Sequence, residues 1–350
     1  GFGIFITLWA WVQYDLKFDK FHEDIDQMYL LNVTISMNGT EYTSQRTGGI
    51  YSELLAQEFP QVLSACRVSE AQEFELGVER SDGGDELVMR YFDEDEILAV
   101  DSSFLDFFSF PLLHGNREMI FSERDHIVLT ESLAKKLFNT EDALDKTVRV
   151  GEGAYFKVVG IVEDPPEESS YQFQALMGFH IMEEQGYPTN GYGGTIYFNN
   201  FIINPQADLI SLSKAIDDLV LENFDSDLEA RYFLDSFARL HLHGEDKGIL
   251  GFYLNLIMSL VILSIACINF INLTTAYSAG RIKEIFIRKS AGASKTQLIS
   301  QFMGETYLLL LFSFYLGLFI AEHLLPEVTR SFGVTLQSGM TGIKINAGNG

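Results

Sequence analysis

The residues that come closest to a catalytic motif are Gly292 to Thr296, which read G-A-S-K-T. Glycine, lysine and a hydroxyl side chain are the ingredients of a phosphate-binding loop, in which lysine and backbone N–H groups hold nucleotide phosphates. That loop needs the spacing G-x-x-x-x-G-K-[ST] after a strand, and here no glycine directly precedes Lys295. Because no other stretch fits this spacing, the sequence predicts no nucleotide site and no cofactor of the chain's own.

Two further groups have side chains of the kind that bind metals. His241 and His243 would share one face of a strand predicted for residues 231–242, but no third ligand is spaced nearby. The acidic run D-E-D-E at 93–96 lacks the ligand spacing of a calcium loop, which favours a solvated edge. No pairing of a nucleophile with a base is recognisable. We therefore expect no metal site, no catalytic residue and no enzyme activity in this chain.

Long apolar runs dominate the elements that would position any functional residue. Leu250 to Thr275 carry no charge, and at about 1.5 Å per residue this run is long enough to cross a bilayer core of about 30 Å. A second run, from Tyr307 to Leu325, contains one acidic residue and ends at Pro326. The first twelve residues are also uncharged, which predicts the end of a first transmembrane helix. The sequence therefore indicates a membrane protein, and a fragment of one.

Charge indicates the side of the membrane on which each segment lies. Residues 1–248 hold 45 acidic and 17 basic side chains, whereas residues 276–301 hold five basic ones and only Glu284 as an acid. Short basic loops beside a span stay in the cytoplasm, while a large domain crosses the membrane largely regardless of its charge. The acidic domain is therefore expected outside and the basic loop inside. Such an acidic domain argues against nucleic acid or anionic lipid as its partner.

These observations divide the chain into six segments. They are residues 1–12 as the end of a first transmembrane helix, 13–248 as an extracytoplasmic domain, 249–275 as a second transmembrane helix, 276–303 as a cytoplasmic elbow, 304–325 as a third transmembrane helix and 326–350 as a truncated extracytoplasmic segment. In the large domain, strands alternate with single helices, which predicts an α+β fold. We expect two subdomains of mixed sheet plus helices, the two ends of the domain forming one and its middle the other, joined to an α-helical transmembrane bundle.

Three local patterns in the large domain make specific predictions. The phenylalanine-rich stretch from Phe104 to Leu112 is expected to lie in a core. Thr130 is expected to cap a helix that begins at Glu131. The sequence R-S-D-G-G-D-E at 80–86 predicts a tight turn between two strands.

The sequence of the basic loop is more regular than is needed for a loop whose positive charge only fixes the membrane topology. Residues 281–289, R-I-K-E-I-F-I-R-K, favour a helix in which Glu284 is spaced for pairing with Arg281 and Arg288. The small residues at 290–294 predict a turn before the next span. Two interpretations are open: a basic loop that only fixes the topology, or a docking element for a cytoplasmic partner.

At this point the chain resembles a known family. The run A-C-I-N-F-I-N-L-T-T-A-Y-S-A-G-R-I-K-E-I-F-I-R-K-S-A-G-A-S-K (266–295), followed by Q-F-M-G-E (301–305), resembles the core of MacB/FtsX-type ABC transporter permeases. Four pieces resemble the MacB-like periplasmic core domain of such permeases: Y-D-L-K-F-D-K-F-H (14–22), V-D-S-S-F-L-D-F-F-S-F-P-L-L-H-G (100–115), V-L-T-E-S-L-A-K-K-L-F (128–138) and V-V-G-I-V-E-D-P-P (158–166). The resemblance covers nearly the whole chain.

The resemblance implies a multi-pass protein of a bacterial inner (cell) membrane, with a large periplasmic domain, a fourth transmembrane helix and an ATPase subunit on another polypeptide. Matching the family pattern residue by residue gives an ATPase-docking elbow of Arg281, Lys283, Glu284, Ile285, Phe286, Arg288, Lys289, Gly292 and Ala293. The family pattern has glycine where Phe286 stands, so Phe286 adds a bulky apolar group to this surface. In the second span, Asn255, Asn269 and Asn272 are suited to packing between transmembrane helices through hydrogen bonds.

The function that the resemblance implies is mechanotransmission. A separate cytoplasmic ATPase would bind and hydrolyse ATP, and the permease would convert this into movement of its periplasmic domain. Export of peptide, antibiotic or lipoprotein-like substrates from the periplasm and activation of a cell-wall hydrolase are both compatible with this. Further partners implied are a second permease copy or homologous half, a periplasmic adaptor and membrane lipid. The alternative is a membrane-anchored sensor or adhesion module that has no ATPase partner.

Overall fold

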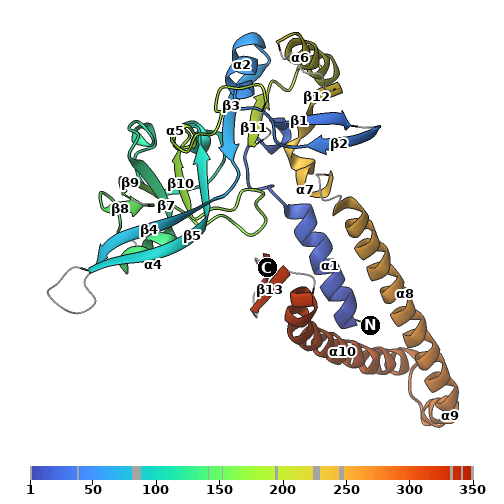
Figure 1. Ribbon diagram of the computed structural model, residues 1–350. Helices are drawn as coiled ribbons and strands as arrows, with labels where there is room; N and C mark the ends of the chain where they lie inside the picture. The colour runs from blue at the N-terminus through green and yellow to red at the C-terminus, as the bar shows by residue number, and fades with distance from the viewer. Residues whose placement is uncertain are drawn as a thin grey trace. The chain divides into compact units, whose positions relative to one another are not determined.

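The computed structural model describes residues 2–37, 39–80, 88–140, 142–151, 153–193, 196–223, 229–243, 248–331, 334–339 and 342–347. The chain divides into two compact units, one of residues 1–17 and 247–350 and the other of residues 18–246 (Figure 1). The first unit is mainly helical, and the second is built from strands with short helices.

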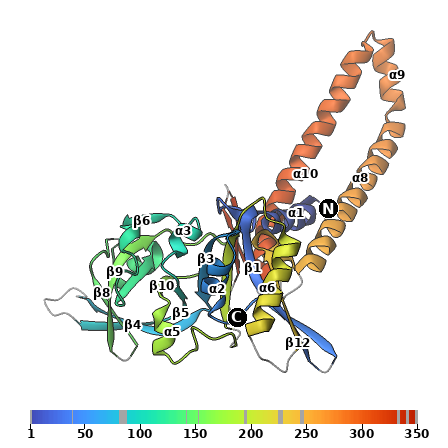
Figure 2. The same ribbon diagram turned by 90° about the horizontal axis from the view of Figure 1, so that it is seen from above.

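Long helices form the first unit. Its elements are α1 (Phe2–Lys17), α8 (Gly248–Gly280), α9 (Ile282–Ser290), α10 (Lys295–Ser331) and a hairpin of β13 (Val334–Gly339) and β14 (Gly342–Ala347). Segments Ile249–Tyr277 of α8 and Lys295–Ile320 of α10 are long and apolar enough to cross a membrane. Figure 2 shows that α9 joins the C-terminal end of α8 to the N-terminal end of α10. α1 packs against both, and a Cβ added to Gly3 would lie 3.0 Å from the carbonyl oxygen of Gly317, a close approach that small residues allow.

The limits of α10 differ from those that the apolar run predicts. The helix begins inside the predicted elbow, at Lys295, because Ser294 and Gln297 cap its first turn. It also continues past Pro326 to Ser331. A proline removes one helical hydrogen bond and disturbs the preceding turn, but it does not require the helix to stop. The apolar run therefore marks only the part of the helix that is suited to lipid.

The second unit contains one mixed sheet of twelve strands. The strands are β1 (Met28–Met37), β2 (Thr40–Ser44), β3 (Val62–Ser69), β4 (Gln72–Arg80), β5 (Val88–Val100), β6 (Leu112–Gly115), β7 (His126–Thr130), β8 (Thr147–Val150), β9 (Ala154–Val162), β10 (Ala175–Gly178), β11 (Tyr197–Ile203) and β12 (Glu229–Ser236). The helices are α2 (Tyr51–Glu58), α3 (Phe104–Phe107), α4 (Glu131–Phe138), α5 (His180–Glu184), α6 (Leu209–Asn223) and α7 (Leu240–His243), with 3₁₀ turns η1 (Ile25–Gln27), η2 (Arg117–Met119) and η3 (Phe237–Arg239). The predicted tight turn at 80–86 lies almost wholly outside the described residues.

Six of these strands close into a barrel. Their order is β10-β7-β9-β8-β4-β5, and β10 also pairs with β5 in parallel, with Ala175 opposite Ile97. Alternate residues point inward, among them Leu76, Val148 and Phe156, and they form one apolar core. α4 adds Leu133, Ala134 and Leu137 to the same core. The hydroxyl of Thr130 caps this helix by accepting a hydrogen bond from the N–H of Leu133 at 3.3 Å, as the sequence predicts.

The other end of the sheet is formed by strands from both ends of the domain. Here the order is β3-β11-β1-β12, and side chains from α2 and α6 complete a second core with Leu31 and Phe201. A third core contains Phe104, Phe108 and Phe110, so the phenylalanine-rich stretch is buried as predicted. The inserted middle and the two ends thus occupy different parts of the fold. However, they share one continuous sheet and one compact unit, so they are not separate bodies.

One predicted strand ends earlier than its sequence indicates. Residues 231–242 were expected to be extended, but β12 stops at Ser236 and the chain continues as η3 and α7. The reason is its partner: Ser236 lies opposite Tyr29, next to the residue where β1 begins, so no strand remains to pair with. His241 is therefore helical, and its ring stacks on Phe18 at a centroid distance of 3.7 Å.

The outer edge of β12 is covered by polar side chains. The N–H of Tyr232 donates to Asp217 Oδ1 at 2.7 Å, and the N–H of Leu234 donates to Ser213 Oγ at 3.3 Å. Asp217 and Ser213 lie one turn apart on α6, so one face of that helix satisfies two successive outward amides. Edge amides without such partners can pair with another chain. α6 therefore both completes a core and covers this stretch of the outer edge of β12.

Candidate functional site

The nine residues predicted for the elbow lie together in and after α9. The helix follows Arg281, which has non-helical backbone angles and separates α9 from α8. Glu284 Oε1 and Arg288 Nη2 are 2.6 Å apart, an ion pair at the i, i+4 spacing that the sequence predicts. The remaining predicted residues follow along the helix and into the turn before α10. Six of the nine residues thus lie on α9, whereas Arg281 directly precedes the helix and Gly292 and Ala293 follow it.

Gly292 and Ala293 end α9. Gly292 has a φ of +94°, and its N–H donates to the carbonyl of Lys289 at 3.2 Å. The N–H of Ala293 donates to the carbonyl of Arg288 at 3.0 Å. These two bonds form a Schellman motif, which needs a residue that tolerates positive φ. The stretch G-A-S-K-T is therefore a helix stop followed directly by the start of α10.

The inner face of α9 is bound to α10. Arg281 forms an ion pair with Glu305, and Arg288 Nη1 donates to Gln301 Oε1 at 2.7 Å. Gln301 Nε2 in turn donates to Glu305 Oε1 at 3.4 Å, so the contacts form a connected network. The sequence pattern places both arginines on the docking surface but does not indicate that Glu305 and Gln301 are their partners. The motif Q-F-M-G-E, which resembles the family pattern, contains both of these partners.

The outer face of α9 is apolar and basic. The side chains of Ile282, Phe286 and Ile287 are 65%, 72% and 67% exposed. Lys283 and Lys289 are also exposed, whereas Ile285 is half-buried. Three large apolar side chains on one short helix are unfavourable in water unless another surface covers them. The predicted elbow therefore has two faces, one that holds the helix and one that is available for contact.

The asparagines predicted for helix packing have different environments. Asn269 and Asn272 line a hollow of about 730 Å³ between α8 and α10, with Ser313, Gly317 and apolar residues around them. Asn255 is half-buried and is not among the residues of this hollow. The three are therefore not one cluster.

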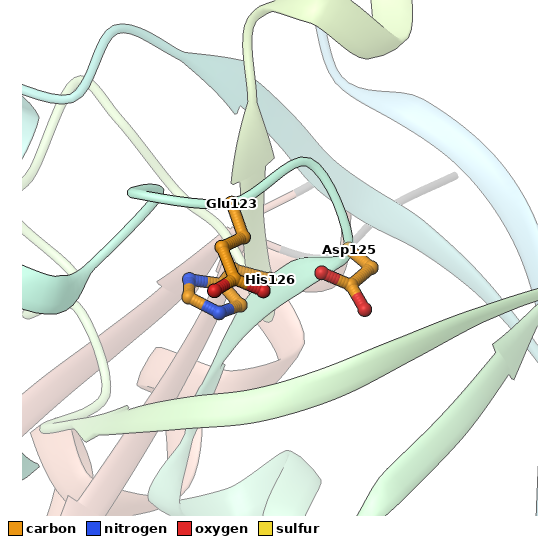
Figure 3. Close-up of side chains that lie close together, drawn as sticks. All are labelled: Glu123, Asp125 and His126. Atoms are coloured by element: carbon orange, nitrogen blue, oxygen red, sulfur yellow. The ribbon is translucent and has the colours of Figure 1, made fainter.

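One group in the described part of the chain has the geometry of a cation site. One ligand atom from each of Glu123, Asp125 and His126 lies within 4.8 Å of the others (Figure 3). This group was not predicted, although its spacing E-x-D-H is local. Asp145, Glu123 and Asp125 all raise the pKa of Lys157, with the hydrogen bond to Asp145 as the largest cause. Because an ammonium already faces these carboxylates, the cluster does not need a metal ion to balance its charge.

The other candidate metal residues are not arranged as the sequence indicated. The run at 93–96 lies within β5, where side chains alternate between the two faces of the sheet. Asp93 and Asp95 are exposed, as the expectation of a solvated edge requires. Glu94 departs from it, because it is only 2% exposed and pairs with Lys136 Nζ at 2.6 Å. The side chain of His243 lies outside the described residues.

Two buried titratable side chains lie three residues apart after α1. Asp19, at a φ of 58°, accepts hydrogen bonds from the backbone N–H and the hydroxyl of Ser170. His22 Nδ1 accepts one from the N–H of Ser109, and the ring of His22 packs against Phe110. Burial raises the pKa of Asp19 to about 6 and lowers the pKa of His22 to about 4. Burial therefore favours the neutral form of both side chains, which is the protonated form of Asp19 and the deprotonated form of His22.

We expect these two groups to give opposite pH dependences of stability. From about pH 4 to 6 folded Asp19 keeps a proton that the unfolded chain has lost, so its contribution falls as pH rises. His22 is neutral when folded but protonated when unfolded, so its contribution rises over this range. The substitution Asp19→Asn removes the contribution that falls with pH and leaves that of His22, which rises. The slope of the unfolding free energy with pH should therefore increase by up to about 1.4 kcal/mol per pH unit. Urea unfolding of residues 18–246 at several pH values measures this, and an unchanged slope would contradict it.

Two family models match the chain. The model of the MacB-like periplasmic core domain matches residues 1–219, which is more than half of the sequence. The model of the FtsX-like permease C-terminal matches residues 256–342, which include α9 and its partners on α10. A search of curated proteins found no match.

Three solved structures are similar to the chain. A domain of a protein described as a permease from Porphyromonas gingivalis matches with a TM-score of 0.53 and 21% identity, over 62% of this chain and 92% of that one. The periplasmic region of MacB from Actinobacillus actinomycetemcomitans gives a TM-score of 0.38 and 15% identity, over 59% and 88%. The extracellular domain of the noncanonic ABC-type transporter YknZ from Gram-positive bacteria gives 0.40 and 12%, over 59% and 99%. The first of these supports the α+β fold alone.

Proposed function

This chain belongs to the MacB/FtsX-type family of ABC transporter permeases, and from that membership we propose that it is a transmembrane subunit driven by a separate cytoplasmic ATPase. In this proposal α8 and α10 cross an inner membrane, residues 18–246 lie in the periplasm, and α9 lies in the cytoplasm. The basic charge of residues 276–301 supports this orientation, because short basic loops stay cytoplasmic. The chain itself has no catalytic role, and the partner binds ATP.

The observation that carries the proposal is the two-sided elbow. α9 has nine residues, its end is closed by a Schellman motif, and ion pairs and hydrogen bonds hold it to the following span. It nevertheless presents isoleucine and phenylalanine to solvent. A loop that only fixes topology does not need this construction, whereas a docking element for another protein does.

The proposed mechanism is mechanotransmission. ATP binding and hydrolysis move the ATPase, α9 follows it, and the spans pass the movement to the periplasmic domain. A second permease copy or a homologous half completes the transporter, with a periplasmic adaptor as a further partner. The substrates proposed are peptide, antibiotic or lipoprotein-like molecules taken from the periplasm. The closed, filled barrel supports a domain that moves as a body rather than one that conducts a substrate through itself.

The test is binding and stimulation of an ATPase. The full-length permease in lipid nanodiscs is mixed with an ABC-type ATP-binding subunit from the same cell, and complex formation and ATP turnover are measured. We expect a stable complex whose ATP turnover differs from that of the free ATPase. If folded permease binds no ATPase, the proposal fails and a membrane-anchored sensor or adhesion module takes its place.

A further inference from the structure

We infer that α9 contacts its partner through the outer face alone, and that the inner face is a latch that makes α9 move together with α10. This inference rests on the proposed function. It assigns six of the nine predicted docking residues to two faces and adds Ile282 and Ile287, which the prediction did not include. The outer face consists of Ile282, Lys283, Phe286, Ile287 and Lys289. The inner face consists of Arg281, Glu284 and Arg288, with Gln301 and Glu305 on α10.

The inner face is already occupied by contacts within the chain. Arg281 is paired with Glu305, and its guanidinium carbon lies 5.7 Å from the ring centroid of Phe302. Arg288 is bound on one side by Glu284 and on the other by Gln301. Planar guanidinium groups with several partners are held in a defined orientation. The charges of these arginines are therefore already balanced within the chain, and another protein would have to compete with the network that holds α9.

The outer face has the chemistry of a contact surface. Ile282 and Phe286 are one helical turn apart and form an exposed apolar stripe, to which Ile287 is adjacent. Lys283 and Lys289 lie beside this stripe, and the whole loop from 276 to 301 has an excess of basic charge. The occupant that complements it is an ATPase surface with an apolar hollow and carboxylates at its rim. In such contacts, apolar side chains that enter a pocket carry most of the binding energy. Complementary charges at the edge favour the correct partner and fast association.

The two joints of α9 are not equivalent. Between α9 and α10 the chain is fixed by the Schellman motif, by the reciprocal bonds of Ser294 and Gln297, and by the inner-face pairs. Between α8 and α9, Arg281 interrupts the helix with φ −94° and ψ 4°. Displacement of α9 is therefore transmitted to α10, and the junction at Arg281 accommodates the change of angle. Glu305 is thus a positioning residue that acts through Arg281.

Separate measurements of affinity and of coupling test this inference. The full-length permease in nanodiscs is titrated with the ATPase, and ATP turnover of the complex is recorded. We expect Phe286→Ala and Lys283→Glu/Lys289→Glu to raise the Kd about tenfold or more. Phe312→Ala is the matched control: Phe312 is 70% exposed but lies within the candidate span of α10, so the Kd should not change.

The inner-face variant should behave differently. Glu305→Gln should leave the Kd within about threefold, because the outer face is intact, but it should abolish most of the permease-dependent change in ATP turnover. The exchanged pair Arg281→Glu/Glu305→Arg should restore the turnover, which a general loss of folding would not allow. Spin labels at Ser290 and Ser300 should show a broader distance distribution in Glu305→Gln than in the wild type.

Three outcomes would overturn the inference. The first is a Kd that Glu305→Gln raises as much as Phe286→Ala does. The second is a wild-type complex that no outer-face variant weakens. In the third, the outer-face variants bind the ATPase as the wild type does but no longer bind vesicles containing phosphatidylglycerol. This result would identify a lipid surface as the occupant of the outer face. In each case the wild type still binds the ATPase. Absence of that binding would instead reject the proposed function.

Discussion

Gly49→Ala should lower the free energy of unfolding of residues 18–246 by about 3 kcal/mol, because overpacking of this severity forces the backbone to move. A Cβ at Gly49 would lie 2.0 Å from the carbonyl oxygen of Thr189 and 2.6 Å from its carbonyl carbon. Both atoms are backbone, so no flexible side chain can turn away. Gly48 is confined in the same way, 2.3 Å from the carbonyl oxygen of Gly191. The segment around 189–191 therefore crosses the chain where only glycine fits.

The matched control for this substitution is Gly153→Ala. Gly153 has no atom within 4 Å of an added Cβ, so its substitution should change stability by no more than about 0.5 kcal/mol. Urea unfolding measures both values, and an unchanged m-value shows that the unfolded state is comparable. The 18–246 fragment is a suitable material because it forms a compact unit with its own cores. If Gly49→Ala lowers the free energy of unfolding by less than about 1 kcal/mol, the contact between Gly49 and the backbone of Thr189 is looser than the structure describes.

Arg67→Met should have a similarly large effect, of about 3 kcal/mol, because it leaves a partly buried carboxylate without its partner. Arg67 Nη2 lies 2.8 Å from Asp101 Oδ1, and Nη1 donates to the carbonyl of Gly49 at 3.0 Å. Its guanidinium also stacks on Phe179, with 4.1 Å between the guanidinium carbon and the ring centroid. One side chain thus connects β3, the Gly49 crossing and the barrel.

A more exposed ion pair provides the comparison for Arg67. Arg46 pairs with Glu70, and these two side chains are 36% and 44% exposed, about twice as much as those of Arg67 and Asp101. Arg46→Met should therefore cost less than about 1 kcal/mol. The double variant Arg67→Met/Asp101→Asn should recover part of the loss, since it also removes the carboxylate that Arg67→Met leaves unpaired. Equal effects of the two arginine substitutions would show that burial does not strengthen the Arg67 contacts.

The parts of the fold that sequence predicted depend on local patterns. The two helices long and apolar enough to span follow from runs with few charges, the cap at Thr130 from a hydroxyl before a helix-forming stretch, and the core at 104–112 from clustered phenylalanines. Closure of the barrel does not follow from any local pattern, because β5 and β10 are far apart in the chain. The burial of Glu94 was likewise missed, since its partner Lys136 lies on a helix that the sequence cannot place against β5.

The candidate site shows the same division. Spacing and charge predict helix α9, its Glu284–Arg288 pair and its position between two long apolar helices. They do not predict the roles of Arg281 and Arg288, because a basic residue in a loop is equally compatible with a partner protein and with a contact inside the chain. Glu305 is 24 residues from Arg281, so only the folded hairpin brings their charges together.

The covered edge of β12 has a consequence for how copies of this protein associate. Asp217 and Ser213 accept hydrogen bonds from the two backbone amides of β12 with which an incoming strand would have to pair. A neighbouring molecule therefore cannot pair with this stretch of β12 unless α6 is first displaced. Where many copies of the domain stand side by side on one surface, the amides of Tyr232 and Leu234 offer no template for chain-to-chain growth, and ordered pairing of two copies must use surfaces other than this stretch.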